Sequence, residues 1–248
     1  MGDSLNRATR SLRTAFSMQQ KPPLILPRGL ILVASVWLIL SWSVAIGFRP
    51  PVEASSASYT PGVRLMLISA VIGLIIGWPM LRLSLGTASY PIKQTVLDLV
   101  VLLALVQVVV WPLRLVTPWS PARTAALDAT LVAWTVLAGA IVASAVGTQR
   151  AGPRNIAIVA CLCMCLAGPS LAILGLHMRP LDGFSHRLLQ IGPLLEVHAL
   201  SGGGRTAPHA AQWMWIGIVA AAAAATWSVL GVMAMMRSKD ADRPATFE

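Results

Sequence analysis

The sequence has little charge for its length. Only 11% of its 248 residues are charged and 56% are hydrophobic, whereas an average globular chain carries roughly 25% charged residues. A soluble surface needs more charge than this, so an ordinary soluble domain is excluded. The apolar residues form blocks long enough to cross a bilayer, which indicates a polytopic membrane protein with no room for a separate soluble domain.

Acidic residues are scarcer than basic ones, and the net charge is +10. The basic residues are spread along the whole chain and most of them flank apolar blocks. A bilayer with an anionic surface explains this distribution better than a nucleic acid does. No aromatic-basic recognition motif is present, so we expect no nucleic-acid partner.

Cysteine is limited to three residues, Cys161, Cys163 and Cys165, inside one apolar block. They provide no disulfide framework. On a helix, Cys161 and Cys165 share a face while Cys163 points elsewhere, so three metal ligands cannot converge. We expect small packing residues here and no soft-metal site.

Histidine is absent from the apolar blocks, and all four histidines lie in one polar segment: His177, His186, His198 and His209. Their spacing matches no zinc pattern, and bis-histidine haem in a bundle needs histidines within the spans. The chain also lacks a Gly-x-Ser-x-Gly elbow, a His-Glu-x-x-His pair and a Walker loop. We therefore expect no enzyme, with no catalytic residue, no metal and no cofactor.

Six long apolar blocks are present, and they predict an all-α integral membrane bundle of six transmembrane helices. The predicted spans are residues 30–48, 65–81, 95–113, 129–147, 156–176 and 213–236. Arg64 and Arg82 bracket the second span, and Gly168-Pro169 is expected to break the fifth. The first apolar run exceeds the about 7–15 residues of a secretory signal core, although small residues at 54–57 leave cleavage as an alternative.

Two polar ends flank the membrane domain, which covers residues 30–236. Residues 1–29 suit a cytoplasmic basic amphipathic helix on the membrane surface or a disordered tail, and residues 237–248 form a second tail. Six spans put both termini on one side, which then holds 12 of the 19 Lys and Arg residues against 7 on the other. The positive-inside rule predicts cytoplasmic termini in a plasma membrane, and residues 177–212 outside.

Small residues recur at helical spacing in three spans. We expect them to allow close helix packing in lipid. They are Gly73 and Gly77 in the second span, Gly139, Ala143 and Gly147 in the fourth, and Gly217, Ala221 and Ala225 in the sixth.

Two spans carry polar groups that are costly in hydrocarbon. Asp98 lies in the first turns of the third span, where Lys93 or Gln94 could reach it, and Gln107 lies near its middle. A carboxylate within a span faces protein, water or a partner. A structural role and a functional role both remain open for Asp98, and Asp128 is expected to be a helix N-terminal charge.

The segment between the last two spans is apolar in part. Residues 184–200 are expected to form two short helices that enter the outer interface without crossing it, with a break at Gly192-Pro193. Glu196 and His198 are candidates for an outer-face proton or ligand site, with interfacial side chains as the alternative. Residues 202–204 are three glycines and are expected to form a flexible turn.

The layout resembles the membrane subunit of type-2 ATP-binding-cassette exporters, the ABC-2 permeases. Residues 90–97 are similar to the family's Leu-Pro-Ile-Ser-Arg segment before the third span, and residues 192–195 look like its Ser-Pro-Leu segment before the sixth. The resemblance implies an amphipathic lead-in helix, a re-entrant hairpin between spans five and six, and separate ATP-binding subunits. It makes Tyr90, Pro91 and Lys93 the candidate coupling residues.

The leading interpretation is a transport subunit, an ABC transporter permease that acts as a homodimer or hetero-oligomer in the cell inner membrane. The alternative is a non-transporting structural or assembly subunit that uses residues 177–212 for partner contacts. A third class is an intramembrane enzyme or haem protein. Neither the substrate nor the direction of transport can be derived from the sequence.

Overall fold

A computed structural model describes residues 27–48, 55–85, 90–148, 150–177 and 192–241. Every regular element in these ranges is a helix, and six helical runs are long and apolar enough to cross a membrane. The predicted all-α bundle of six transmembrane helices is therefore confirmed. The lead-in residues 1–26, His186 and the first part of the expected 184–200 hairpin lie outside the described residues.

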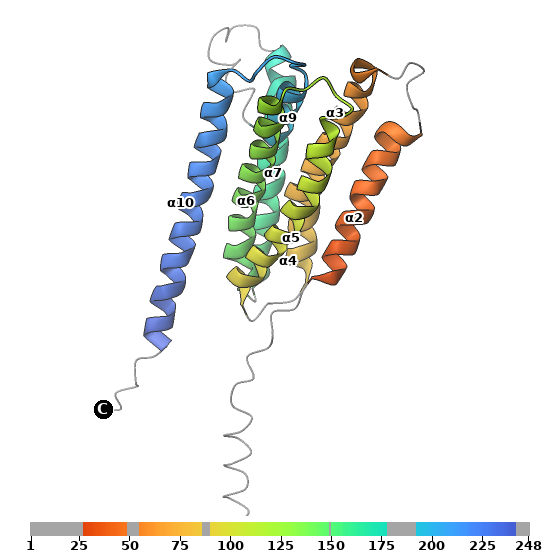
Figure 1. Cartoon of the computed structure of the whole chain (residues 1–248). Helices are drawn as coiled ribbons and strands as arrows, with labels where there is room; N and C mark the ends of the chain where they lie inside the picture. The colour runs from red at the N-terminus through yellow and green to blue at the C-terminus, as the bar shows by residue number, and fades with distance from the viewer. Residues whose placement is uncertain (1–26, 49–54, 86–89, 149, 178–191, 242–248) are drawn as a thin grey trace, which may run out of the picture.

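The chain alternates direction through the bundle (Figure 1). The first run joins α2 (Arg28–Trp42) to a π-helical turn, η1 (Ser43–Gly47), and the second joins α3 (Ser56–Ile72), η2 (Gly73–Gly77) and α4 (Trp78–Ser84). The remaining elements are α5 (Pro91–Leu113), α6 (Pro121–Val146), α7 (Ala151–His177), α9 (Pro193–Ser201) and α10 (Ala210–Ala241).

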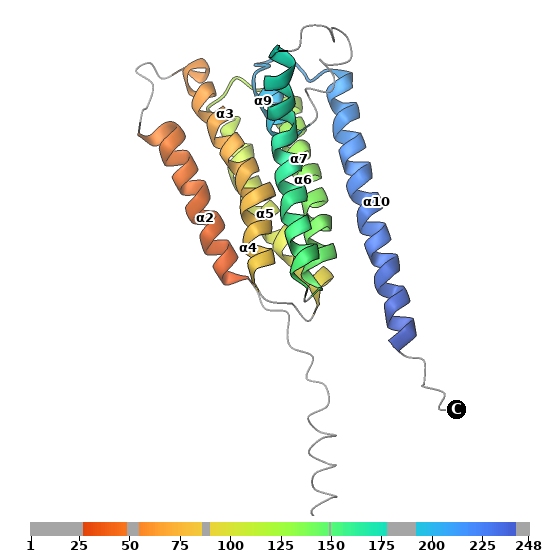
Figure 2. The same cartoon turned by 180° about the vertical axis from the view of Figure 1, so that it is seen from behind.

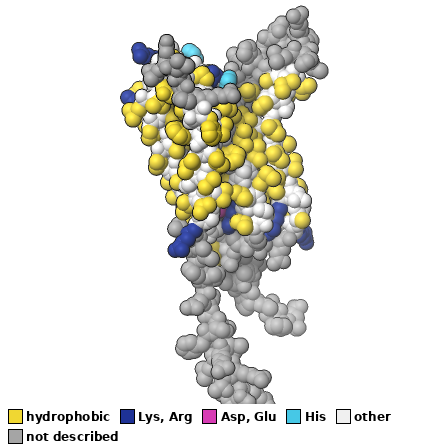
Figure 3. Space-filling view, turned by 90° about the vertical axis from the view of Figure 1, so that its right-hand side faces the viewer, with side chains coloured by type: hydrophobic (Ala, Val, Ile, Leu, Met, Phe, Trp, Pro, Cys, Tyr) yellow, Lys and Arg dark blue, Asp and Glu magenta, His cyan; other side chains and the backbone are white. Residues whose placement is uncertain are grey.

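Helix α6 lies at the centre of the bundle and contacts α4, α5, α7, α9 and α10. Helices α2 and α10 flank it on opposite sides in both views (Figures 1 and 2). The short helix α9 lies at one end, here called the α9 end, and the ends of α4 and α6 and the starts of α5 and α7 define the opposite, Arg82 end. In Figure 3, hydrophobic side chains cover the middle of one face and basic side chains lie toward its ends.

The second span is longer than predicted, because its helix runs from Ser56 to Ser84. Arg64 and Arg82 are therefore inside the helical run and do not bracket it. A serine capping box starts this helix, with Ser55 and Ser58 exchanging side-chain and backbone hydrogen bonds. The polar start of this helix lies at the same end of the bundle as α9, so its backbone groups need not face the hydrocarbon core.

Two further helix expectations were wrong. Helix α6 begins at Pro121 behind an Ser120 N-cap, so Asp128 lies two turns inside the helix and is no N-terminal charge. Helix α7 continues through Gly168 and Pro169 without a break. Proline costs a helix one backbone donor, and membrane helices tolerate that cost because neighbouring groups satisfy the freed carbonyl.

The small residues of the second and fourth spans differ in what they contact. A Cβ on Gly73 would lie 2.6 Å from Trp37 Nε1, and one on Gly139 would lie 2.6 Å from Leu99 Cδ1. Gly147 approaches Pro91 in the same way, at 3.2 Å, and Ala143 is buried. Close helix approach at these glycines explains the absence of a side chain.

Other members of the predicted stripes have no such neighbour. A Cβ on Gly77 would meet only the Ile72 carbonyl oxygen at 3.9 Å. Gly217, Ala221 and Ala225 of α10 are exposed, and a Cβ on Gly217 would meet nothing within 4 Å. Within the described chain, these positions do not mediate helix packing.

Candidate functional site

A buried ion pair joins α4 to α5 near the Arg82 end. Arg82 Nε lies 3.2 Å from Asp98 Oδ2, and the two side chains are 13% and 1% exposed. Gln94 Nε2 donates a hydrogen bond of 3.1 Å to Asp98 Oδ1 from one turn earlier in α5. Of the two residues expected to reach Asp98, Lys93 or Gln94, the structure shows Gln94 as the partner. Arg82 was missed because it was placed at a span boundary.

The candidate coupling residues lie at the start of the same helix. Tyr90 is the N-cap residue of α5, and Pro91 occupies its first turn. Lys93 Nζ lies 5.7 Å from the centroid of the Tyr90 ring, within the range of a cation–π interaction. Tyr90 and Pro91 are half-buried and Lys93 is exposed, so this corner of the Arg82 end is accessible to a partner.

A second polar group joins α5 to α6. Gln107 Nε2 donates to Asp128 Oδ1, and Trp111 Nε1 donates a 2.7 Å hydrogen bond to Gln107 Oε1. The sequence singled out Gln107 but not its partner. The three side chains are linked by these two hydrogen bonds, which lowers the cost of polar groups within a membrane span.

Helix α9 carries the two residues expected to form an outer-face site, but they contact different helices. Trp134 Nε1 of α6 donates a 2.8 Å hydrogen bond to Glu196 Oε2, while Glu196 Oε1 is buried and has no hydrogen-bond partner among the described residues. His198 Nε2 lies 3.0 Å from Arg64 Nη2 of α3. The two side chains therefore have separate partners, one on α6 and one on α3.

Burial shifts the pKa of both Glu196 and His198. It raises the pKa of the Glu196 carboxyl, and the hydrogen bond from Trp134 opposes that rise only in part. Burial and the charge of Arg64 lower the pKa of the His198 imidazole. Both shifts favour the neutral form relative to an exposed side chain, and a neutral His198 Nε2 can accept a hydrogen bond from Arg64.

Three donors from other elements hold the carbonyl end of α9, and we call them the α9 clamp. Arg64 Nη2 donates to the His198 oxygen at 3.2 Å, Arg123 Nη1 to the Leu200 oxygen at 2.6 Å, and Trp119 Nε1 to the Ser201 oxygen at 3.1 Å. Cations at a helix C-terminus also interact favourably with its dipole. The clamp therefore fixes α9 on α3 and α6.

The triple glycine packs against Arg123 of this clamp. Arg123, only 2% exposed, also donates to the Thr206 oxygen from Nε and to Thr206 Oγ1 from Nη2. A Cβ on Gly203 would lie 2.0 Å from Arg123 Nη1. The expected turn therefore packs directly on a buried guanidinium at Gly203.

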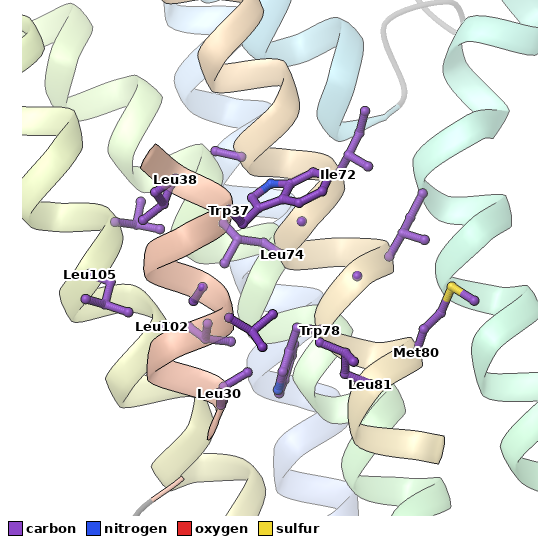
Figure 4. A pocket seen from close by; sticks show the side chains of 17 residues that line it. Leu30, Trp37, Leu38, Ile72, Leu74, Trp78, Met80, Leu81, Leu102 and Leu105 are labelled. Atoms are coloured by element: carbon purple, nitrogen blue, oxygen red, sulfur yellow. The ribbon is translucent and has the colours of Figure 1, made fainter. Parts of the chain in front are cut away.

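A lateral pocket lies between α2, the α3–η2–α4 run and α5, with a volume of about 460 Å³. Its lining is nearly all apolar, and Figure 4 shows Trp37, Leu74 and Trp78 among the side chains around it. Sequence reasoning missed the pocket, because it depends on how three separate helices diverge. Its only sequence signals are Gly73 and Gly77, which both line it.

No group of three or more His, Cys, Asp or Glu side chains suited to a metal occurs among the described residues. Comparisons with protein-family models, with curated proteins and with solved structures found no match. The class defined by the fold alone is therefore an all-α, six-span integral membrane protein whose fifth and sixth spans are separated by a clamped helix.

Proposed function

We propose that the chain is the membrane-embedded, permease-like subunit of an ATP-driven exporter and acts with separate ATPase subunits in a plasma membrane. The observation that carries this proposal is α9, a short helix between the last two spans. It packs on α3, α6 and α7 at one end of a six-span bundle. That layout agrees with the resemblance to ABC-2 permeases.

The opposite end supports the proposal through its connectivity. An ATPase outside the membrane needs a contact through which its motion reaches the spans. Tyr90 begins α5, Gln94 and Asp98 follow on the same helix, and Arg82 links them to α4. A push on Tyr90 would therefore move two helices together, through a buried ion pair rather than through a flexible loop.

The test is the effect of Tyr90→Ala on co-purification of ATPase subunits with the tagged chain from native membranes. Loss of one buried aromatic anchor costs about 2 kcal/mol, or roughly 30-fold in affinity. Tyr59→Ala is the matched control, because Tyr59 is the other tyrosine of the chain, is also half-buried, and lies near the α9 end. Lys93→Ala, which removes the cation over the Tyr90 ring, should weaken association to a smaller extent.

Two outcomes contradict the proposal. Equal losses for Tyr90→Ala and Tyr59→Ala would show that the Arg82 end is not the contact. Recovery of no ATPase with the unmodified chain, while other membrane subunits co-purify in fixed ratio, would favour the structural or assembly subunit that contacts partners through residues 177–212.

A further inference from the structure

The lateral pocket has three walls from three spans. Leu30, Ala34 and Trp37 come from α2, Gly73, Gly77 and Trp78 from η2 and α4, and Leu102 and Leu105 from α5. Two hydrogen bonds hold α2 to α3 above it, from Trp37 Nε1 to the Ser69 oxygen at 3.1 Å and between the Ser41 and Ser69 hydroxyls at 2.7 Å. Figure 4 shows Leu30, Trp37, Trp78 and Leu102 around the pocket.

The lining of the pocket does not suit water. A buried water needs two to four polar partners, and the lining consists of Leu, Ile, Val, Ala, Met, Gly and Trp only. An empty space of about 460 Å³ leaves its walls without dispersion contacts on one side. An apolar occupant of matching volume would restore those contacts.

The surroundings of the pocket identify the source of that occupant. Val33, Trp37, Met80 and Leu81 line it and are also exposed on the outer surface of the bundle. They belong to helices long and apolar enough to span a membrane, so the opening lies at the depth of the lipid tails. A lipid tail can therefore enter sideways, with no polar surface to cross.

We infer that the lateral pocket binds one hydrocarbon chain of a membrane phospholipid. If a methylene group takes up about the 30 Å³ that a water molecule occupies in the liquid, a space of about 460 Å³ holds about 15 chain carbons. That length is comparable with a phospholipid tail. The inference does not rest on the proposed function, since the pocket is built by this chain alone.

The experiment compares lipid retention by variants that fill the pocket with retention by a matched control. Gly77→Leu places four carbons in the pocket, because a Cβ there meets only one atom within 4 Å. Gly217→Leu is the same substitution on the exposed face of α10, where a Cβ meets nothing. Ala34→Phe fills the pocket from the α2 wall, and it serves if Gly77→Leu disturbs the π-helical turn.

Full-length protein in mild detergent is incubated with phosphatidylcholine that carries a photoreactive group midway along one tail. We expect cross-links on peptides from α2 and the η2–α4 run, and about one retained lipid per chain in native mass spectrometry. Gly77→Leu and Ala34→Phe should reduce both signals at least about 5-fold, with unchanged elution and melting temperature, while Gly217→Leu keeps them. Cross-links spread evenly over all exposed helices and insensitive to both filling variants would overturn the inference.

Discussion

Gly203 shows how strongly one missing side chain can be required. The Arg123 guanidinium occupies the place of its Cβ and donates to three carbonyl or hydroxyl groups of residues 200–206. Any larger residue must displace a charged group that is almost wholly buried. Such a change disturbs only the junction between α9 and α10, but a buried Arg123 charge without hydrogen-bond partners costs much folding free energy.

We expect Gly203→Ala to lower the free energy of unfolding by about 3 kcal/mol, the scale on which breaking a buried charged contact acts. The measurement is thermal or chemical unfolding in detergent. Gly204→Asn is the control, since Gly204 has open space around it and a φ of 57°, which Asn tolerates. An equal loss for both variants would mean that turn conformation, and not Arg123, sets the requirement.

Glu196 predicts a pH dependence of stability. Its pKa is raised in the folded chain above the usual 4.5, so the unfolded state loses its proton first as pH rises. Stability therefore falls as pH increases from about 4.5 through the raised pKa. Below this window the carboxyl is neutral in both states and has no effect.

We expect Glu196→Gln to remove this contribution while its amide oxygen still accepts the Trp134 hydrogen bond. The variant should melt at the same temperature as the unmodified chain at pH 4 and at a higher temperature at pH 8. His198 has the opposite slope, because its lowered pKa makes stability fall as pH decreases below about 6.5. The His198 contribution cancels when the variant and the unmodified chain are compared at the same pH. A difference in melting temperature that does not change with pH would exclude a role for Glu196 ionisation.

Residues within one helix turn of each other could be paired from the sequence, and residues on different helices could not. Gln94 was one of two nearby residues, with Lys93, that were expected to reach Asp98 on the same helix, and it is the one that does. Arg64 with His198, Trp134 with Glu196 and Arg82 with Asp98 each join separate helices, and only the packed bundle brings them together. A carboxylate in a predicted span indicates that it has a polar partner, but the sequence does not identify that partner.

At the scale of elements, the Arg82–Asp98 pair links α4 to α5. Removing one partner leaves the other charge buried, whereas removing both leaves two apolar surfaces that can pack. We expect Asp98→Leu or Arg82→Met alone to cost about 3 kcal/mol or more in unfolding free energy, and the double variant to recover most of that loss. A double-mutant cycle measured in detergent gives the coupling directly. Additive single losses would mean that the two side chains act independently.

The existence of each span could be predicted, but the ends of several could not. The spans predicted from hydropathy stop at Arg64 and at Asp128, because a hydropathy scale treats each charge as exposed to lipid. In the bundle, Arg64 binds the end of α9 and Asp128 accepts from Gln107. The helices continue past both charges because protein partners take the place of water. A hydropathy average over one segment of sequence contains no information about partners on other segments.

At the scale of the whole molecule, the proposed orientation can be tested with exposed alanines at opposite ends. Ala207 lies in the turn after α9 and Ala151 begins α7, and both are exposed. In a variant without Cys161, Cys163 and Cys165, we expect an impermeant thiol reagent to label Ala207→Cys in sealed cells. Ala151→Cys should react only after the membrane is opened, and the reverse pattern would place the termini outside.

The π-helical turn η2 has a consequence for the whole assembly. It inserts one residue beyond the α-helical repeat between α3 and α4, and each residue turns a helix by about 100°. Deleting one residue from Gly73–Gly77 would leave a continuous α-helix of nearly the same length and hydropathy. It would also swing everything after it by more than a quarter turn, carrying Arg82 away from Asp98 and Trp78 out of the pocket wall. One extra residue thus sets the rotation of α4 relative to α3. The pocket wall and the ion pair both depend on that rotation, so the deletion would remove both.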